Sequence, residues 1–241
     1  MTKITSLVIV KQRYENKYPI PKYLISVTIF FTFSHSALFA EAKKVACLGD
    51  SITFGAGVKN RGENNYPLQL EKMLGNNYQV KNFGVNGATI LKKGDKPYWK
   101  LGAYKAALAF EPDIVVIKLG TNDTKPRNWK HKADYVANYV EMIASLRSLK
   151  SKPTIWVCYP VPAYPGRWGI SDKTIKTEVK PLLDKVSKKT KVKIIDLYTA
   201  LSGKPEFFPD TVHPNAAGAK IIAETVHKAI TAKPAALTPV P

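Results

Sequence analysis

Short apolar runs alternate with longer amphipathic segments along most of the chain. Five runs are typical of buried β-strands: 45–48, 78–83, 114–117, 154–158 and 192–195. Five intervening segments carry apolar residues at helical spacing: 66–74, 98–110, 136–146, 175–186 and 214–230. Pro214 is expected to open the last helix, and Pro181 to kink the fourth. This alternation predicts an α/β domain with three α/β/α layers, in which helices cover both faces of a parallel five-stranded sheet.

The first forty residues follow another pattern. Lys17 and Lys22 precede an apolar run over 23–33, and small residues follow up to Ala40. A basic region, an apolar region and small residues before a cleavage site form a secretory signal peptide. The alternatives are an uncleaved membrane anchor or a buried helix, but a spanning helix needs roughly 20 apolar residues. We therefore expect a signal peptide and leader over 1–40, cleaved after Ala40 or Ala42, and a periplasmic or secreted protein.

The remaining sequence is long enough for one folded domain. The chain has 241 residues, of which 45% are hydrophobic, so it can form a core and is not globally disordered. We place the folded domain at 41–232, and a Pro/Ala-rich tail at 233–241 that we expect to be flexible.

The charge is strongly basic. There are 37 Lys and Arg against 18 Asp and Glu, a formal net charge of +19, which favours an anionic partner or surface. Lysines are densest between Lys173 and Lys193, most simply as the solvent-exposed face of a helix, and alternatively as a surface that attracts anionic glycans or a membrane. The aromatic and glycine pattern of nucleic-acid-binding modules is missing, so no nucleic-acid partner is expected. No obligate protein partner is predicted.

Polar residues suited to acyl transfer follow the predicted strands. Ser51 comes just after the first, Gly87 after the second and Asn122 after the third, and Asp210 and His213 precede the last helix. The carboxyl ends of parallel strands meet at one edge of a sheet. A serine needs a base to become a nucleophile, and His213, oriented by Asp210, supplies one. The backbone N–H groups of Ser51 and Gly87 and the side-chain amide of Asn122 are candidate oxyanion donors.

Other chemistries lack their motifs. The glycines at 55 and 57 have no third glycine of a dinucleotide loop, and no phosphate-binding loop follows. No cluster of His, Cys and Asp has the spacing of a zinc site, and two cysteines cannot form a disulfide scaffold. The sequence therefore predicts a site without a metal or a cofactor.

The four loops resemble the sequence blocks of the SGNH hydrolase superfamily, also called GDSL esterases. The serine, glycine, asparagine and histidine of those blocks match Ser51, Gly87, Asn122 and His213, and the aspartate of the last block matches Asp210. The resemblance runs from about residue 45 to 230. It implies a flavodoxin-like sheet with strand order 2-1-3-4-5, the SGNH hydrolase fold, and hydrolysis of esters without a cofactor. Within the superfamily, the chain is similar to exported bacterial esterases described as sialate or other carbohydrate O-acetylesterases.

Two details follow from the resemblance. Isoleucine at position 52 replaces the leucine of the Gly-Asp-Ser-Leu block and leaves the serine untouched. The implied strand order puts the third strand between Cys47 and Cys158, and two strand spacings exceed the reach of a disulfide. We therefore expect both cysteines to be unpaired.

Aromatic and basic residues in the loops near the site suggest a sugar substrate. We identify Trp99, Arg127, Arg167 and Trp168 as candidate substrate contacts, because aromatic rings stack on sugars and arginine binds carboxylates or hydroxyls. The alternative is that the tryptophans, including Trp129, pin loops onto helices. The walls of the acyl pocket are expected from the loops after Ser51, Gly87 and Asn122, and Phe54, Val85 and Ile90 are the only large apolar residues close to these loops.

The sequence thus predicts a serine esterase for short-chain, acetyl esters, acting on O-acetyl groups of carbohydrates. Two alternatives stay open at this point. One is a short-chain aryl esterase or lysophospholipase, and the other is a non-catalytic glycan-binding protein on the same fold.

Overall fold

A computed structural model of the chain describes residues 41–165 and 167–232. The predicted leader over 1–40 and the predicted tail over 233–241 lie outside the described residues. The described ranges fall in one structural unit.

Five strands form one sheet, and their positions agree with the five apolar runs. They are β1 (Lys43–Gly49), β2 (Tyr78–Gly84), β3 (Ile114–Lys118), β4 (Thr154–Cys158) and β5 (Lys193–Ile195). The order is β2-β1-β3-β4-β5 and every neighbouring pair is parallel, which confirms the expected topology. In this register Gly49 at the end of β1 pairs with Lys118 at the end of β3. The loops that leave these two strands therefore begin side by side.

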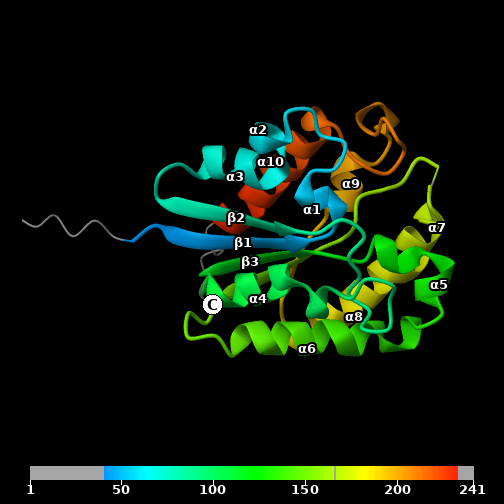
Figure 1. Ribbon diagram of the computed structural model, residues 1–241, viewed down its shortest axis with the longest axis horizontal. Coiled ribbons are helices and arrows are strands. Elements are labelled where there is room, and N and C mark those ends of the chain that lie inside the picture. The colour runs from blue at the N-terminus through cyan, green and yellow to red at the C-terminus, as the bar shows by residue number, and fades with distance from the viewer. Residues whose placement is uncertain (1–40, 166, 233–241) are drawn as a thin grey trace, which may run out of the picture. The chain divides into compact units, whose positions relative to one another are not determined.

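Helices cover both faces of the sheet, as Figure 1 shows. One layer contains α3 (Tyr66–Leu74) and α10 (Ala216–Thr231), and the other contains α4 (Gly102–Ala109), α6 (Tyr135–Arg147) and α8 (Lys180–Thr190). Five shorter helices lie in the connections: α1 (Ser51–Phe54), α2 (Arg61–Asn64), α5 (Pro126–Trp129), α7 (Asp172–Thr174) and α9 (Leu197–Leu201). The three-layer α/β/α prediction is confirmed.

Three helices differ from the prediction. The segment 98–110 divides into a 3-10 turn and α4, because Leu101 is extended, with a ψ of 146°. The last helix begins at Ala216 instead of Pro214, because the side chain of Asn215 caps it by accepting the N–H of Gly218. Before α8, a π-helical turn over Ile175–Val179 replaces the kink expected at Pro181, which lies in the first turn of α8.

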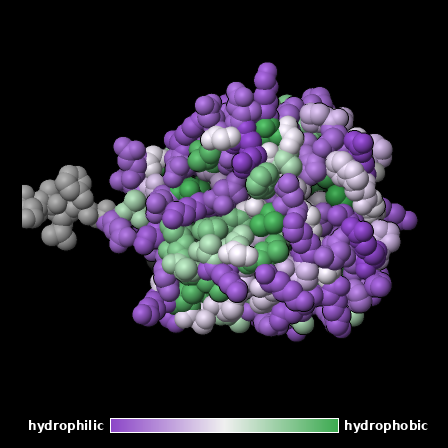
Figure 2. All heavy atoms as spheres, in the orientation of Figure 1, coloured by the Kyte–Doolittle hydropathy of each residue, from purple (hydrophilic) through white to green (hydrophobic). Residues whose placement is uncertain are grey.

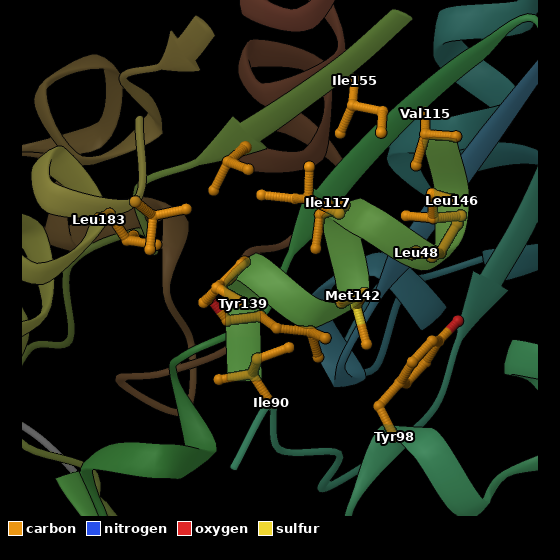
Figure 3. Close-up of a cluster of buried hydrophobic side chains, with 14 of the residues drawn as sticks. Leu48, Ile90, Tyr98, Val115, Ile117, Tyr139, Met142, Leu146, Ile155 and Leu183 are labelled. Atoms are coloured by element: carbon orange, nitrogen blue, oxygen red, sulfur yellow. The ribbon is translucent and has the colours of Figure 1, made fainter. Parts of the chain in front are cut away.

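Alternate residues of the central strands enter two separate cores. On one face, Leu48 and Ile117 pack against Met142 and Leu146 of α6 (Figure 3). Burying side chains of this size stabilises the fold by about 1.5–3 kcal/mol each. On the other face, Val45, Cys47 and Val116 pack with residues of α3 and α10. The sheet is thus held from both sides, which makes its carboxyl edge a rigid base for loops.

Both cysteines lie in the second core and are unpaired, as expected. Burial raises the pKa of the Cys47 thiol to about 12, although a hydrogen bond from Tyr66 opposes the shift. Burial also raises the pKa of Cys158. Neither sulfur is a thiolate at neutral pH, so neither is a nucleophile.

The face seen in Figure 2 is mostly hydrophilic. An apolar area lies where Phe83 at the end of β2 meets the alanine-rich side of α4 and Phe110. In the basic segment, every lysine between Lys173 and Lys193 except Lys180 is exposed, in line with a solvated helix face. Of the helices that the structure describes, none has the length and apolarity needed to cross a membrane.

Candidate active site

Ser51 lies at the first position of α1, immediately beyond the end of β1. The side chain of Asp50 starts this short helix by accepting the N–H of Ile52 at 2.9 Å. The turn requires the glycine before it, because a Cβ on Gly49 would lie only 2.1 Å from the Thr53 hydroxyl. Ser51 is therefore held on a sharp strand-to-helix turn at the carboxyl edge of the sheet.

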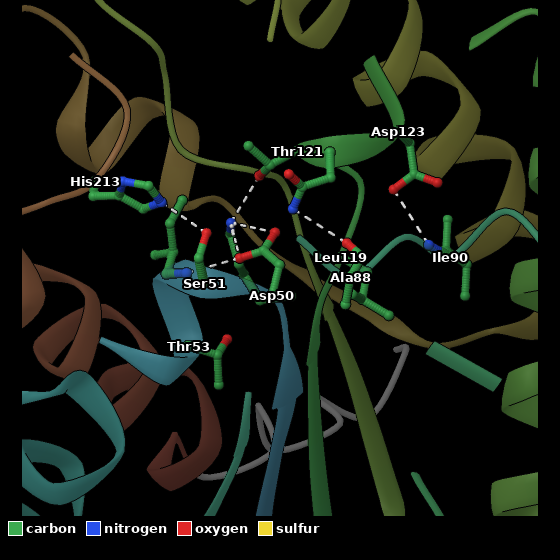
Figure 4. A network of polar contacts seen from close by, with 12 residues as sticks. Asp50, Ser51, Thr53, Ala88, Ile90, Leu119, Thr121, Asp123 and His213 are labelled. Atoms are coloured by element: carbon green, nitrogen blue, oxygen red, sulfur yellow. Dashed lines mark hydrogen bonds and ion pairs between the residues drawn. The ribbon is translucent and has the colours of Figure 1, made fainter. Parts of the chain in front are cut away.

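A continuous chain of hydrogen bonds joins the three residues predicted as a triad. His213 Nε2 lies 2.8 Å from Ser51 Oγ (Figure 4), and His213 Nδ1 lies 2.7 Å from Asp210 Oδ2. The other carboxylate oxygen of Asp210 accepts the backbone N–H groups of Val212 and His213 at 3.0 and 2.7 Å. Burial opposes ionisation of Asp210, but these donors outweigh it and lower the pKa of the carboxyl. An ionised Asp210 keeps the proton of His213 on Nδ1 and leaves Nε2 free to accept one from the serine.

The loop that carries Asp210 and His213 has a strained backbone. Thr211, between Asp210 and His213, has a φ of 72°, which is rare for a β-branched residue. The hydrogen bonds of Asp210 to the two following backbone N–H groups hold this conformation. Strain of this kind persists where the surrounding contacts fix the backbone, and here it sets the distance between Asp210 and His213.

The predicted oxyanion donors lie on the opposite side of the serine. Gly87 has a φ of 79°, and Asn122 begins a 3-10 turn over Asn122–Thr124 directly after β3. Asn122 Nδ2 donates one bond to the carbonyl of Ala88 at 3.2 Å, and a primary amide carries a second N–H. Ser51, Gly87, Asn122 and His213 all line one pocket of about 210 Å³. The structure therefore brings together every residue predicted for the triad and the oxyanion hole.

Asp123 fixes the position of the loop that follows β2. Its fully buried carboxyl accepts the N–H groups of Leu91 at 2.9 Å and Ile90 at 3.2 Å (Figure 4). Burial raises the pKa of this carboxyl to about 7, against the effect of the two backbone donors. No local pattern in the sequence indicates this role of Asp123, because its two partners lie more than thirty residues away.

Trp168 is the candidate substrate contact that the structure places at the pocket. Its ring is 53% exposed, lines the pocket and lies 5.4 Å from the ring of His213. The guanidinium of Arg167 lies over the indole of Trp168, with its central carbon 4.8 Å from the ring centroid. An exposed indole beside His213 offers a flat apolar surface to a ligand.

The other candidate contacts lie outside the pocket lining. The indole of Trp99 donates to the carbonyl of Ile90 at 2.9 Å and packs on Tyr104, so it pins the loop after β2. Arg127 forms an ion pair with Asp95 at 2.5 Å. The alternative that these tryptophans anchor loops thus describes Trp99, and also Trp129, whose indole donates to Glu178.

The three predicted loops contribute Ala56, Gly87 and Lys125 to the pocket wall, but the large apolar residues near them do not take part. Phe54, Val85 and Ile90 do not line the pocket, and Ile90 is fully buried in the core. The walls are Ala56, Trp168 and Ile170, with Asn86 and Lys125 as further polar lining. Trp168 and Ile170 come from the long loop after β4, and no local pattern in the sequence indicates that this loop folds over Ser51. Within 41–165 and 167–232, no three His, Cys, Asp or Glu side chains gather as a metal site would require.

Comparison with known proteins agrees with this geometry. The sequence model of the GDSL-like Lipase/Acylhydrolase family matches residues 47–221, a span that holds all five predicted site residues. An acetylxylan esterase of Xylanibacter ruminicola is 43% identical over 208 residues, which cover 79% of this chain and 43% of that protein. The chain thus spans less than half the length of this relative.

Solved structures share the fold. Est24, a carbohydrate acetylesterase from Sinorhizobium meliloti, superimposes with a TM-score of 0.65 at 19% identity, covering 78% of this chain and 98% of its own. The aryl esterase of M. smegmatis gives a TM-score of 0.64 at 20% identity with the same coverage. At these identities the likeness concerns the fold alone.

Proposed function

Because the chain belongs to the GDSL-like Lipase/Acylhydrolase family of ester hydrolases, we propose that it removes acetyl groups from carbohydrates through Ser51, His213 and Asp210. The observation that carries the proposal is the hydrogen-bonded series from Asp210 through His213 to Ser51, which ends in a small pocket. The relative named acetylxylan esterase supports the choice of substrate.

The geometry suits a two-step acyl transfer. His213 Nε2 takes the proton of Ser51 while Oγ attacks the ester carbonyl carbon. The resulting oxyanion accepts hydrogen bonds from the N–H groups of Ser51 and Gly87 and from Asn122 Nδ2. The bond from the carbonyl carbon to the sugar oxygen then breaks, His213 gives its proton to that oxygen, and the acetyl group stays on the serine. A water molecule, deprotonated by His213, attacks this ester and releases acetate.

The pocket suits a short acyl chain and a sugar ring. Its volume of about 210 Å³ is below the roughly 300 Å³ at which pockets for drug-sized ligands begin. Ala56 and Ile170 leave room for a small acyl group, and the exposed ring of Trp168 provides a stacking surface above it. Lys125 on the rim can donate hydrogen bonds to sugar hydroxyls.

A substrate panel tests this proposal. Acetate release is measured on acetylated xylan, acetylated pectin and an acetylated hexosamine, beside p-nitrophenyl acetate, p-nitrophenyl octanoate and lysophosphatidylcholine. We expect acetate from at least one glycan and rates that fall from the acetate to the octanoate ester. Trp168→Ala is expected to raise KM for the glycan about tenfold, equivalent to about 1.4 kcal/mol of stacking. Faster hydrolysis of the octanoate ester or the lysophospholipid would favour the lipid alternative. Equal KM values of wild type and Trp168→Ala for the glycan would show that Trp168 does not bind the sugar.

Asn122→Ala is expected to lower kcat for p-nitrophenyl acetate by about 10²–10³-fold with little change in KM. The amide stabilises charge that exists only in the transition state, and one such donor contributes roughly 2.7–4 kcal/mol. Steady-state kinetics measures both constants. Asn138→Ala is the matched control, because Asn138 is also a buried asparagine with a backbone partner, the N–H of Lys92, but lies on α6. An effect on KM alone would assign Asn122 to ground-state binding.

A further inference from the structure

A lysine is buried directly beneath the proposed nucleophile. Lys118 is the last residue of β3, its side chain has no solvent exposure, and among the described residues no other lysine is buried. Its Nζ lies 3.1 and 3.0 Å from the two carboxylate oxygens of Asp50 and 2.8 Å from the hydroxyl oxygen of Thr121. These contacts match the three N–H groups of an ammonium. Figure 4 shows how closely Asp50, Ser51 and Thr121 lie around this point.

Stability alone does not account for a charge at this position. Burial lowers the pKa of Lys118, and the charge of Asp50 acts in the opposite direction. Removing two charges from water usually costs as much as their attraction returns, and apolar residues of similar volume are often equally stable. The preceding residues of β3, Val115 to Ile117, are apolar and buried. Apolar side chains at both 50 and 118 could therefore have served the core equally well.

The partners of Lys118 are each one residue away from the reacting groups. Asp50 precedes Ser51 and caps α1, and Thr121 precedes Asn122. Since β1 and β3 end in register, one ammonium reaches both loops. It also neutralises the Asp50 carboxylate, a buried negative charge that would otherwise stand next to the residue on which an oxyanion forms.

We propose that Lys118 is a positioning residue that holds the nucleophile and the Asn122 oxyanion donor in their relative places through Asp50 and Thr121. The inference rests on the proposed serine esterase chemistry. A shift of about 1 Å between reacting groups can cost 10²-fold in rate. The ground-state contacts of the substrate with Trp168 and Ile170 involve neither loop, so the loss is expected in kcat and not in KM.

Thr121 allows the hydrogen bond to be separated from packing. Thr121→Val keeps the branched shape and removes the hydroxyl that accepts from Lys118, whereas Thr121→Ser keeps the hydroxyl and removes the methyl group. For Thr121→Val we expect kcat for p-nitrophenyl acetate to fall by about 10²-fold with KM within twofold, and for Thr121→Ser a kcat within about threefold of wild type. Thr190→Val is the control, because Thr190 is a buried threonine whose hydroxyl bonds a backbone carbonyl in α8.

Labelling of Ser51 by a fluorophosphonate gives a second measurement that needs no substrate. The labelling rate should fall for Thr121→Val and for Lys118→Met, and stay unchanged for Thr190→Val. If Lys118→Met fails to fold, the two Thr121 variants still test the positioning role. Equal kcat values for Thr121→Val and wild type, a loss confined to KM, or a Thr121→Ser variant as slow as the valine variant would overturn the positioning role. If wild type neither hydrolyses esters nor reacts with the fluorophosphonate, the proposed function itself fails.

Discussion

Ser51→Ala is expected to lower kcat for p-nitrophenyl acetate by on the order of 10⁴-fold or more, because it removes the only group that can form the acyl-enzyme. The substitution deletes one oxygen whose partner is His213 Nε2. The cap of α1 comes from Asp50, not from the serine, so the turn that carries position 51 stays in place.

The measurement combines initial rates with covalent labelling by the fluorophosphonate. Ser51→Ala should lose both the activity and the label while its thermal unfolding midpoint stays close to that of wild type. Ser148→Ala is the matched control, since the Ser148 hydroxyl only donates to a backbone carbonyl at the end of α6. Substantial turnover by the Ser51 variant would exclude the nucleophile.

Asp210→Asn is expected to reduce kcat by about 10³–10⁴-fold. Oδ1 of Asp210 already accepts two backbone N–H groups, so the amide oxygen of an asparagine would stay there and its NH₂ group would face His213 Nδ1. Nδ1 would then have to accept a hydrogen bond from this NH₂ group instead of donating one. The imidazole would change tautomer, and Nε2 would carry a hydrogen where the mechanism needs a lone pair.

The matching control is Asp196→Asn. Asp196 caps α9 by accepting the N–H and the hydroxyl of Thr199, which resembles the local role of Asp210 without a histidine. Steady-state rates and thermal unfolding midpoints are measured for both variants. A loss of rate without a loss of stability indicates the change of tautomer, whereas a loss of both indicates a folding defect. A loss of less than tenfold for Asp210→Asn would mean that His213 is oriented by its backbone alone.

The fold was largely predictable because the central strands β1 and β3 are covered on both faces. The run 114–117, for example, has no polar residue, which predicts a buried strand even when the neighbouring strands are unknown. The gathering of the candidate site residues at one place was predictable for a related reason. Ser51, Gly87 and Asn122 each follow a strand, and the topology of a parallel sheet then brings them to one edge.

The remainder of the site depends on contacts that no local pattern shows. Trp99 and Trp168 look alike in sequence, but Trp99 finds a carbonyl partner at Ile90 and Trp168 stays exposed beside His213. Lys118 follows an apolar run as many exposed lysines do, and its burial depends on Asp50, 68 residues earlier. Such roles are set by tertiary neighbours, so they can be recognised only once the loops are placed.

The two buried cysteines make the protein a convenient scaffold for site-specific conjugation. Alkylating reagents and maleimides react with thiolates, and burial together with the raised pKa values keeps Cys47 and Cys158 protonated and inaccessible. A single cysteine introduced at an exposed position such as Lys105 of α4 would therefore be the one reactive thiol among the described residues. A fluorophore or a solid support could be attached there without first replacing either native cysteine, which would otherwise disturb the core beneath the sheet.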